Sequence, residues 1–150
     1  MYENYTRQSL PSKEYRELLG TALCVFNSNN AFIIENIIRT DASFDWYDLI
    51  DKESGFLIGD ARNTITHNSR NSDIANLFSD LIKMRNRIIH SFQITSNDGE
   101  QILATKTRKN DGNVQFYISK DYLMRFINKN EEFSDLLNQY RDNSMKFNSY

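Results

Sequence analysis

Residues 71–92 constrain the fold more than any other part of the chain. Their apolar side chains recur at steps of three and four: Ile74, Leu77, Phe78, Leu81, Ile82, Ile88, Ile89 and Phe92. This spacing predicts a helix that is buried along one stripe. At about 100° per residue, Arg85 falls near the middle of the stripe, where the pattern would otherwise place Leu or Ile. A guanidinium there needs a partner, because burying an unpaired charge is costly.

Helical patterns also precede this stretch. We expect a long helix with Ser12 as its N-cap residue, since a serine hydroxyl at that position accepts a bond from a free helical N–H. The Asn-rich residues 27–30 interrupt its apolar face, so the pattern fits either one long helix or two in line. A short amphipathic helix is expected within residues 40–53, and a further helical piece at about residues 60–67.

After Phe92 the apolar spacing changes to alternation. Residues 102–109 and 114–120 are rich in β-branched and aromatic side chains and flank an Asn-Asp-Gly-Asn turn signal, which predicts a β-hairpin. A last helix is expected from Ser119 or Asp121, and it should break up in the Asn- and Ser-rich tail that starts at Asp142. The predicted fold is therefore mainly α: a bundle of roughly four to five helices with a β-hairpin inserted before the last helix.

The composition fits one domain. The chain has 150 residues, of which 39% are hydrophobic and 13% aromatic, enough for one core. We expect residues 1–150 to form a single helical domain with loosely ordered ends at residues 1–11 and 142–150. The lone cysteine, Cys24, lies in an apolar run and can form no internal disulfide, which favours a reducing compartment. Because no signal peptide or membrane-spanning run is visible, we expect a cytoplasmic protein without a membrane partner.

Charge is distributed unevenly along the chain. The net charge of -2 gives no general attraction to nucleic acids or anionic membranes. Residues 83–120 nevertheless hold seven Lys and Arg against three acidic residues. Cations of this basic centre could hold RNA phosphates: Lys83, Arg87, Lys106, Arg108 and Lys109. For the hairpin cations, the alternative is that charged strands protect a sheet edge from aggregation.

Three side chains near the end of the central helix have the chemistry to cleave a phosphodiester. Asn86 and His90 are four residues apart and share a helix face. RNA carries its own nucleophile, the 2′-hydroxyl, so cleavage to a 2′,3′-cyclic phosphate needs neither a metal nor a bound water. His90 can act as base or acid near neutral pH. Arg85 can hold two phosphate oxygens, and Asn86 can donate to a phosphate oxygen or orient the imidazole.

The sequence Arg85-Asn86, followed by three residues and then His90, resembles the signature of the HEPN (higher eukaryotes and prokaryotes nucleotide-binding) superfamily. That signature is an Arg, a polar residue and, a few residues later, a His. The long first helix, the Gly-containing middle and the late helix are also similar to the family's layout. The resemblance implies a metal-independent endoribonuclease of toxin–antitoxin, phage-defence or RNA-processing systems, with RNA as substrate and no cofactor. It equally implies an inactive HEPN module that binds RNA, a nucleotide or a partner protein.

The spacing of the motif poses a geometric problem. On an ideal helix, residues five apart point about 140° away from each other, so Arg85 and His90 cannot line one face of an undistorted helix. Either the helix ends or distorts near Ile89, or two copies of the segment meet at a two-fold axis. The family commonly forms such dimers, so the resemblance implies a homodimer with a composite cleft.

The resemblance also bears on regulation. Some toxins of the family are silenced by an antitoxin that adenylylates a tyrosine two residues after the His. Phe92 stands at that position in this chain and has no hydroxyl to modify. That particular modification lacks its acceptor here, and control by an antitoxin or another regulatory protein stays open.

Purely structural roles stay open for the same residues, as in a plain helical interaction domain. Arg85 could be a buried cation paired with Glu35 or with an Asp of residues 41–51, and His90 a histidine that interacts with the helix dipole. His67, the other histidine, fits a capping or surface role better than catalysis. The acidic residues 41–51 are expected to form a solvated face rather than a metal site, so we predict no metal.

Overall fold

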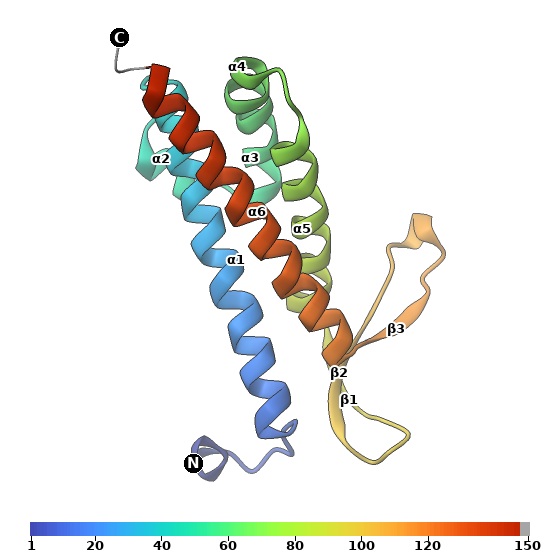
Figure 1. Cartoon of the computed structure of the whole chain (residues 1–150). Coiled ribbons are helices and arrows are strands. Elements are labelled where there is room, and N and C mark those ends of the chain that lie inside the picture. Colours follow the sequence, from blue (N-terminus) through green and yellow to red (C-terminus); the bar gives the residue numbers. More distant parts are fainter. Residues whose placement is uncertain (148–150) are drawn as a thin grey trace.

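Two long helices run side by side and in the same direction through the computed structural model, which describes residues 1–147 (Figure 1). They are α1 (Lys13–Thr40) and α6 (Lys120–Phe147). Helix α5 (Asp73–Ile89) packs against α6 and runs in the opposite direction. Shorter helical pieces connect α1 to α5: α2 (Trp46–Asp51), α3 (Ser54–Ala61), a π-helical turn (Arg62–Thr66) and α4 (His67–Ser69). Among the described residues, no helix is both long and apolar enough to cross a membrane.

Within the described residues, a three-stranded antiparallel sheet in the order β1-β2-β3 lies at the lower end of the helices in Figure 1. Its strands are β1 (Phe92–Thr95), β2 (Gln101–Lys106) and β3 (Gln115–Ile118). Strands β2 and β3 form the predicted hairpin, in which Leu103 lies opposite Ile118. The predicted fold class, a mainly helical bundle with a β-hairpin before the last helix, is confirmed.

Helix α1 is continuous through its Asn-rich residues 27–30. Its N-cap is Ser12, as predicted, and the Ser12 Oγ accepts a hydrogen bond from the Tyr15 N–H at 3.2 Å. In the middle of the helix the Asn29 side chain is buried, and its Nδ2 donates to both the Oδ1 and the main-chain oxygen of Asn130 on α6. This pairing satisfies a polar side chain that would otherwise favour a non-helical conformation.

Stacked aromatic rings at the centre of the core hold α5 against α1 and α6. Phe26 of α1 stacks on Phe78 of α5, with 6.3 Å between ring centroids, and on Phe126 of α6, with 6.0 Å. Phe78 stacks in turn on Phe133 of α6 at 5.4 Å. Aromatic pairs bury large apolar areas in defined geometries. The position of α5 beside α1 is therefore set by the core.

Residues 54–59, which lie between two helices predicted from the sequence, are themselves helical. Helix α3 already begins at Ser54, and its Gly55 and Gly59 are exposed while Leu57 and Ala61 are buried. Burial of this apolar face outweighs the low helix propensity of the two glycines.

Helix α6 continues past Asp142, where the composition predicted that it would break up. Tyr140 is buried near this end, and its hydroxyl forms a hydrogen bond with Thr40 Oγ1 and accepts one from Asn68 Nδ2 at 3.1 Å. These contacts hold the last turns of α6 against α1 and α4. The helix reaches Phe147, and residues 148–150 lie outside the described part of the chain.

Phe92 belongs to strand β1 rather than to the preceding helix, contrary to the sequence prediction. Helix α5 ends at Ile89, and Ser91 Oγ donates to the carbonyl of Ile88 at 2.6 Å. A side-chain donor thus satisfies one of the carbonyls that a helix end leaves free. Phe92 then pairs with Ala104 of β2, so its apolar spacing in the sequence does not reflect a helix.

Candidate functional site

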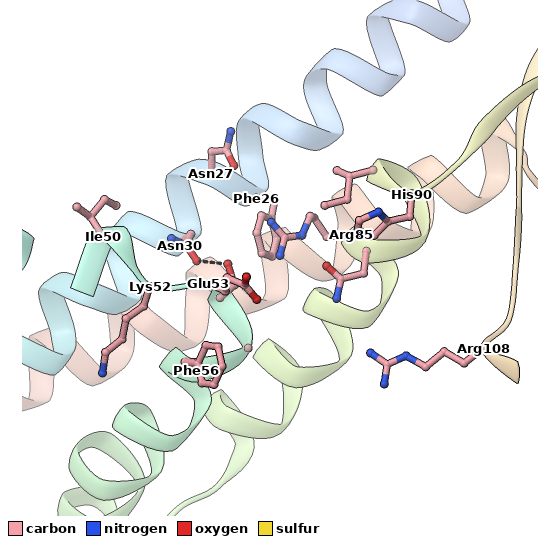
Figure 2. A pocket seen from close by; sticks show the side chains of 14 residues that line it. Phe26, Asn27, Asn30, Ile50, Lys52, Glu53, Phe56, Arg85, His90 and Arg108 are labelled. Carbon is pink, nitrogen blue, oxygen red and sulfur yellow. Dashed lines mark hydrogen bonds between the residues drawn. The ribbon is translucent and has the colours of Figure 1, made fainter. Parts of the chain in front are cut away.

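A cleft of about 740 Å³ opens beside the C-terminal end of α5 (Figure 2). The predicted catalytic residues Arg85, Asn86 and His90 all line it. Its other walls come from α1, from the segment that joins α2 to α3, and from the hairpin. Among the side chains on those walls are Phe26, Asn30, Glu53, Phe56 and Arg108. The volume lies in the usual range of small-molecule and nucleotide pockets.

Arg85 enters the cleft as an unpaired cation. Its Cζ lies 4.9 Å from the centroid of the Phe26 ring, and its Nε is buried without a hydrogen-bond partner among the described residues. Burial lowers the pKa of Arg85, and the negative charge of Glu53 opposes that change. Among the described side chains, no carboxylate lies within 4.0 Å of the guanidinium, so the ion pair with Glu35 or with an Asp of residues 41–51 does not form. The guanidinium is stacked on an aromatic ring, and its Nη groups make no hydrogen bond to a described residue, so they stay free for an anion.

His90 lies where α5 stops. It is the C-cap residue, and its main-chain N–H donates to the carbonyl of Asn86 at 3.1 Å. Its imidazole is exposed and lines the same cleft as Arg85 (Figure 2). No described residue forms a hydrogen bond with the imidazole. Of the two arrangements that could solve the spacing problem, the end of the helix at Ile89 is the one present within a single chain.

Asn86 connects the cleft to a second, smaller hollow. It is half-buried and lines both the cleft and an adjoining depression of about 280 Å³. Arg108 also lines both, while Lys83, Arg87 and Phe116 line the smaller one. A surface with more cations than carboxylates therefore extends from the cleft along the end of α5 to the hairpin, with Asp111 as the acidic residue of the smaller hollow.

The five cations predicted to bind RNA differ in their surroundings. Arg108 reaches toward α5 from the hairpin (Figure 2), and Lys83 and Arg87 line the smaller hollow. Arg87 Nη1 also donates to the carbonyl of Lys106, which ties the hairpin to α5. The Lys106 ammonium is hydrogen-bonded within the hairpin, and Lys109 starts a 3-10 turn at the hairpin tip and lines neither hollow. The structure thus brings Lys83, Arg87 and Arg108 to the candidate site but not Lys106 and Lys109.

Sequence reasoning missed the wall of the cleft opposite α5. Ser54 Oγ donates to Asn30 Oδ1 at 2.8 Å, which holds the start of α3 against α1 and places Glu53 and Phe56 at the cleft (Figure 2). Glu53 is the N-cap residue of α3 but makes no capping hydrogen bond. These residues lie far from Arg85 in the sequence and follow no shared spacing with it, so no local signal marks them.

Other residues considered from the sequence lie elsewhere. Cys24 is exposed on α1 rather than buried in its apolar run, and His67 is exposed on α4. Neither lines the cleft. In the described part of the chain, no group of three or more His, Cys, Asp or Glu side chains could hold a metal ion.

The chain was compared with protein-family models, with curated proteins and with solved structures. None of the three comparisons found a significant match.

Proposed function

We propose that this protein is a metal-independent endoribonuclease of the HEPN type that leaves a 2′,3′-cyclic phosphate. The observation that carries the proposal is the unpaired Arg85 guanidinium in a cleft that Asn86 and His90 also line. Cleavage of a phosphodiester by the 2′-hydroxyl increases the negative charge on the phosphoryl oxygens and requires proton transfer at the bridging oxygens. A free cation beside an accessible imidazole meets both needs.

Each side chain has a separate task in this reaction. The Arg85 guanidinium holds two non-bridging phosphate oxygens and stabilises the charge that develops on them. His90 transfers a proton, and Asn86 donates a hydrogen bond to a phosphate oxygen or to the imidazole. The cations of the adjoining hollow hold phosphates of neighbouring nucleotides: Lys83, Arg87 and Arg108.

A second candidate is a HEPN-like module without catalytic activity that binds RNA, a nucleotide or a partner protein. One observation favours it. No described residue hydrogen-bonds the His90 imidazole, whereas catalytic histidines are commonly oriented by a third group. The two candidates differ in outcome, because the binding module leaves its RNA intact.

We further propose that the protein acts in the cytoplasm as a toxin or phage-defence effector, controlled by an antitoxin or other regulatory protein. We also propose a homodimer with a composite cleft. The cleft carries apolar side chains that support a partner surface, since Ile50, Phe56 and Ile89 are 41%, 68% and 47% exposed. Light scattering tests the dimer through the mass of the protein in solution.

In a buffer containing EDTA, we expect the purified protein to cut single-stranded RNA and to leave 2′,3′-cyclic phosphate and 5′-hydroxyl ends. A matched strand with 2′-deoxyribose before each mapped cut should stay intact at that position, because its nucleophile is missing. Mass spectrometry of the products identifies the ends. Cleavage of the deoxy-substituted strand would contradict the mechanism, and binding without cleavage would favour the inactive module.

The Arg108→Ala substitution should weaken RNA binding without slowing the reaction of bound RNA. Arg108 lines both hollows, so its loss should remove one phosphate contact. The plot of log binding constant against log salt concentration should then fall less steeply, its slope becoming less negative by roughly 0.7. Binding titrations at several salt concentrations measure this slope, and kcat is measured at saturating RNA. Lys109→Ala is the control, since the neighbouring Lys109 lines neither hollow. Equal effects of the two substitutions would contradict the proposed RNA path.

A further inference from the structure

The proposed cleavage needs two proton transfers, and His90 performs one of them. One group must take the proton from the 2′-hydroxyl, and another must give a proton to the 5′-oxygen as it leaves. The attacking and leaving oxygens lie on opposite sides of the phosphorus in an in-line displacement. The second proton-transfer group is therefore expected across the phosphate site from His90.

We propose that Glu53 is this second group: it accepts the proton of the 2′-hydroxyl, while His90 protonates the leaving 5′-oxygen. This assignment rests on the proposed endoribonuclease function. Among the described residues, Glu53 is the one carboxylate that lines the cleft. It would be a catalytic residue that the Arg-Asn-His spacing does not reveal.

The Glu53 carboxylate is free to accept a proton. Glu53 is exposed, and its side chain makes no capping hydrogen bond to α3. No cationic nitrogen of the described side chains lies within 4.0 Å of it. An ionised carboxylate without partners keeps all its acceptor positions for the substrate.

Glu53 and His90 reach the cleft from different walls, Glu53 from the start of α3 and His90 from the end of α5. Figure 2 shows the Arg85 guanidinium between the Glu53 carboxylate and the His90 imidazole. Glu53 is also near enough for its negative charge to act on the Arg85 guanidinium. A phosphate held by Arg85 can therefore present its attacking oxygen toward one group and its leaving oxygen toward the other.

The proton and electron pairs balance in this scheme. The 2′-hydroxyl gives its proton to the Glu53 carboxylate, and the 2′-oxygen forms a bond to phosphorus. The bond from phosphorus to the 5′-oxygen breaks, and that oxygen takes the proton of the His90 imidazolium. The products are a 2′,3′-cyclic phosphate, a 5′-hydroxyl, a protonated Glu53 and a neutral His90. Proton exchange with water then restores both side chains.

The other charged groups of the cleft do not fit the role of base. They are Lys52, Arg85 and Arg108, all cations that have no free acceptor when protonated. Lys52 is in addition paired with Asp60, with 2.8 Å between Nζ and Oδ2. Glu53 and His90 are thus the two groups on this cleft that suit proton transfer.

The first test is the Glu53→Gln substitution, which keeps the size of the side chain and removes the proton acceptor. We expect the variant to fold normally, because the carboxylate makes no cap, and to bind RNA at least as tightly, because a negative charge is lost. Its cleavage rate at saturating RNA should fall by about 10²-fold or more. Asp51→Asn is the matched control, an exposed acid-to-amide exchange at the end of α2 outside the cleft, and should cut like wild type.

A change of leaving group separates the base from the acid. When the scissile 5′-oxygen of the RNA is replaced by sulfur, the thiolate leaves without protonation, because thiols are much stronger acids than alcohols. We expect this strand to restore cleavage by His90→Ala but not by Glu53→Gln.

The outcomes distinguish this inference from the proposed function. Wild-type cleavage together with a fully active Glu53→Gln protein would overturn the role of Glu53 and leave the endoribonuclease in place. The role of Glu53 would also be overturned if the 5′-sulfur strand restored cleavage by Glu53→Gln, or if that strand failed to restore cleavage by His90→Ala. If wild type itself leaves RNA intact, the proposed function fails and the role of Glu53 fails with it.

Discussion

The Arg85→Met protein is expected to lose RNA cleavage and yet to be more stable than wild type. Methionine can keep the apolar contact with the Phe26 ring, because its flexible thioether packs well against aromatic rings. It removes the cation that holds the phosphate in the proposed reaction. Arginines that act on a transferring phosphoryl group are worth about 10³–10⁵-fold in rate. We expect kcat to fall by at least about 10³-fold.

The gain in stability arises from the unpaired guanidinium. In wild type the Arg85 Nε is buried without a partner, and no described carboxylate neutralises the charge at contact distance. An unsatisfied buried donor lowers the free energy of unfolding by about 1–3 kcal/mol. The contact of the cation with Phe26 raises it by about 0.5–2 kcal/mol. Replacing the guanidinium by an apolar group should therefore raise the free energy of unfolding by about 1 kcal/mol. Function and stability are opposed at this position, as is common for binding sites.

Urea unfolding followed by circular dichroism measures the stability of this variant, and gel analysis of RNA measures its cleavage. Arg125→Met is the control, because Arg125 also lies over an aromatic ring, with 5.7 Å between its Cζ and the Tyr122 ring centroid, but is exposed. It should change the cleavage rate and the stability little. A destabilised Arg85→Met protein would contradict this account, because it would mean that the contact of the guanidinium with the Phe26 ring contributes more to stability than the unpaired buried donor costs.

The His90→Ala protein is expected to cleave RNA about 10²–10⁴-fold more slowly than wild type while keeping its fold and its RNA affinity. The His90 imidazole is exposed and has no hydrogen bond to a described residue. The hydrogen bonds at the end of α5 run from the His90 N–H to the Asn86 carbonyl and from Ser91 Oγ to the Ile88 carbonyl, and alanine at position 90 retains both. A loss of rate in this variant therefore reports proton transfer rather than unfolding.

Added imidazole gives this prediction an independent readout. Because the cleft is open to solvent, free imidazole should partly restore cleavage by His90→Ala and have no effect on Arg85→Met. His67→Ala is the control, since His67 is the other histidine of the chain and is exposed outside the cleft. If His90→Ala cuts RNA at the wild-type rate, the imidazole takes no part in the reaction and the binding module is the better account.

Features that depend on neighbouring residues could be predicted from the sequence. The Ser12 cap, the turn between β2 and β3 and the amphipathic α5 all follow from spacings of a few residues. The same local pattern identified Arg85 as an unusual cation in an apolar stripe. It also predicted that Arg85 and His90 could share a site either if the helix ended or distorted near Ile89 or if two copies met at a two-fold axis, and within one chain the helix does end at Ile89.

Features that depend on contacts between distant segments could not be predicted in this way. The continuity of α1 rests on the bond between Asn29 and Asn130, and the helical start of α3 rests on the burial of Leu57 and Ala61. The sequence by itself identified Arg85, Asn86 and His90 as candidates for holding a phosphate and moving a proton. Only the tertiary structure decided that Arg85 stays unpaired and that Glu53 lines the same cleft as His90. The physical reason is that contacts between distant segments depend on how whole helices pack against each other. The spacing of residues along one helix carries no information about the side chains of another helix.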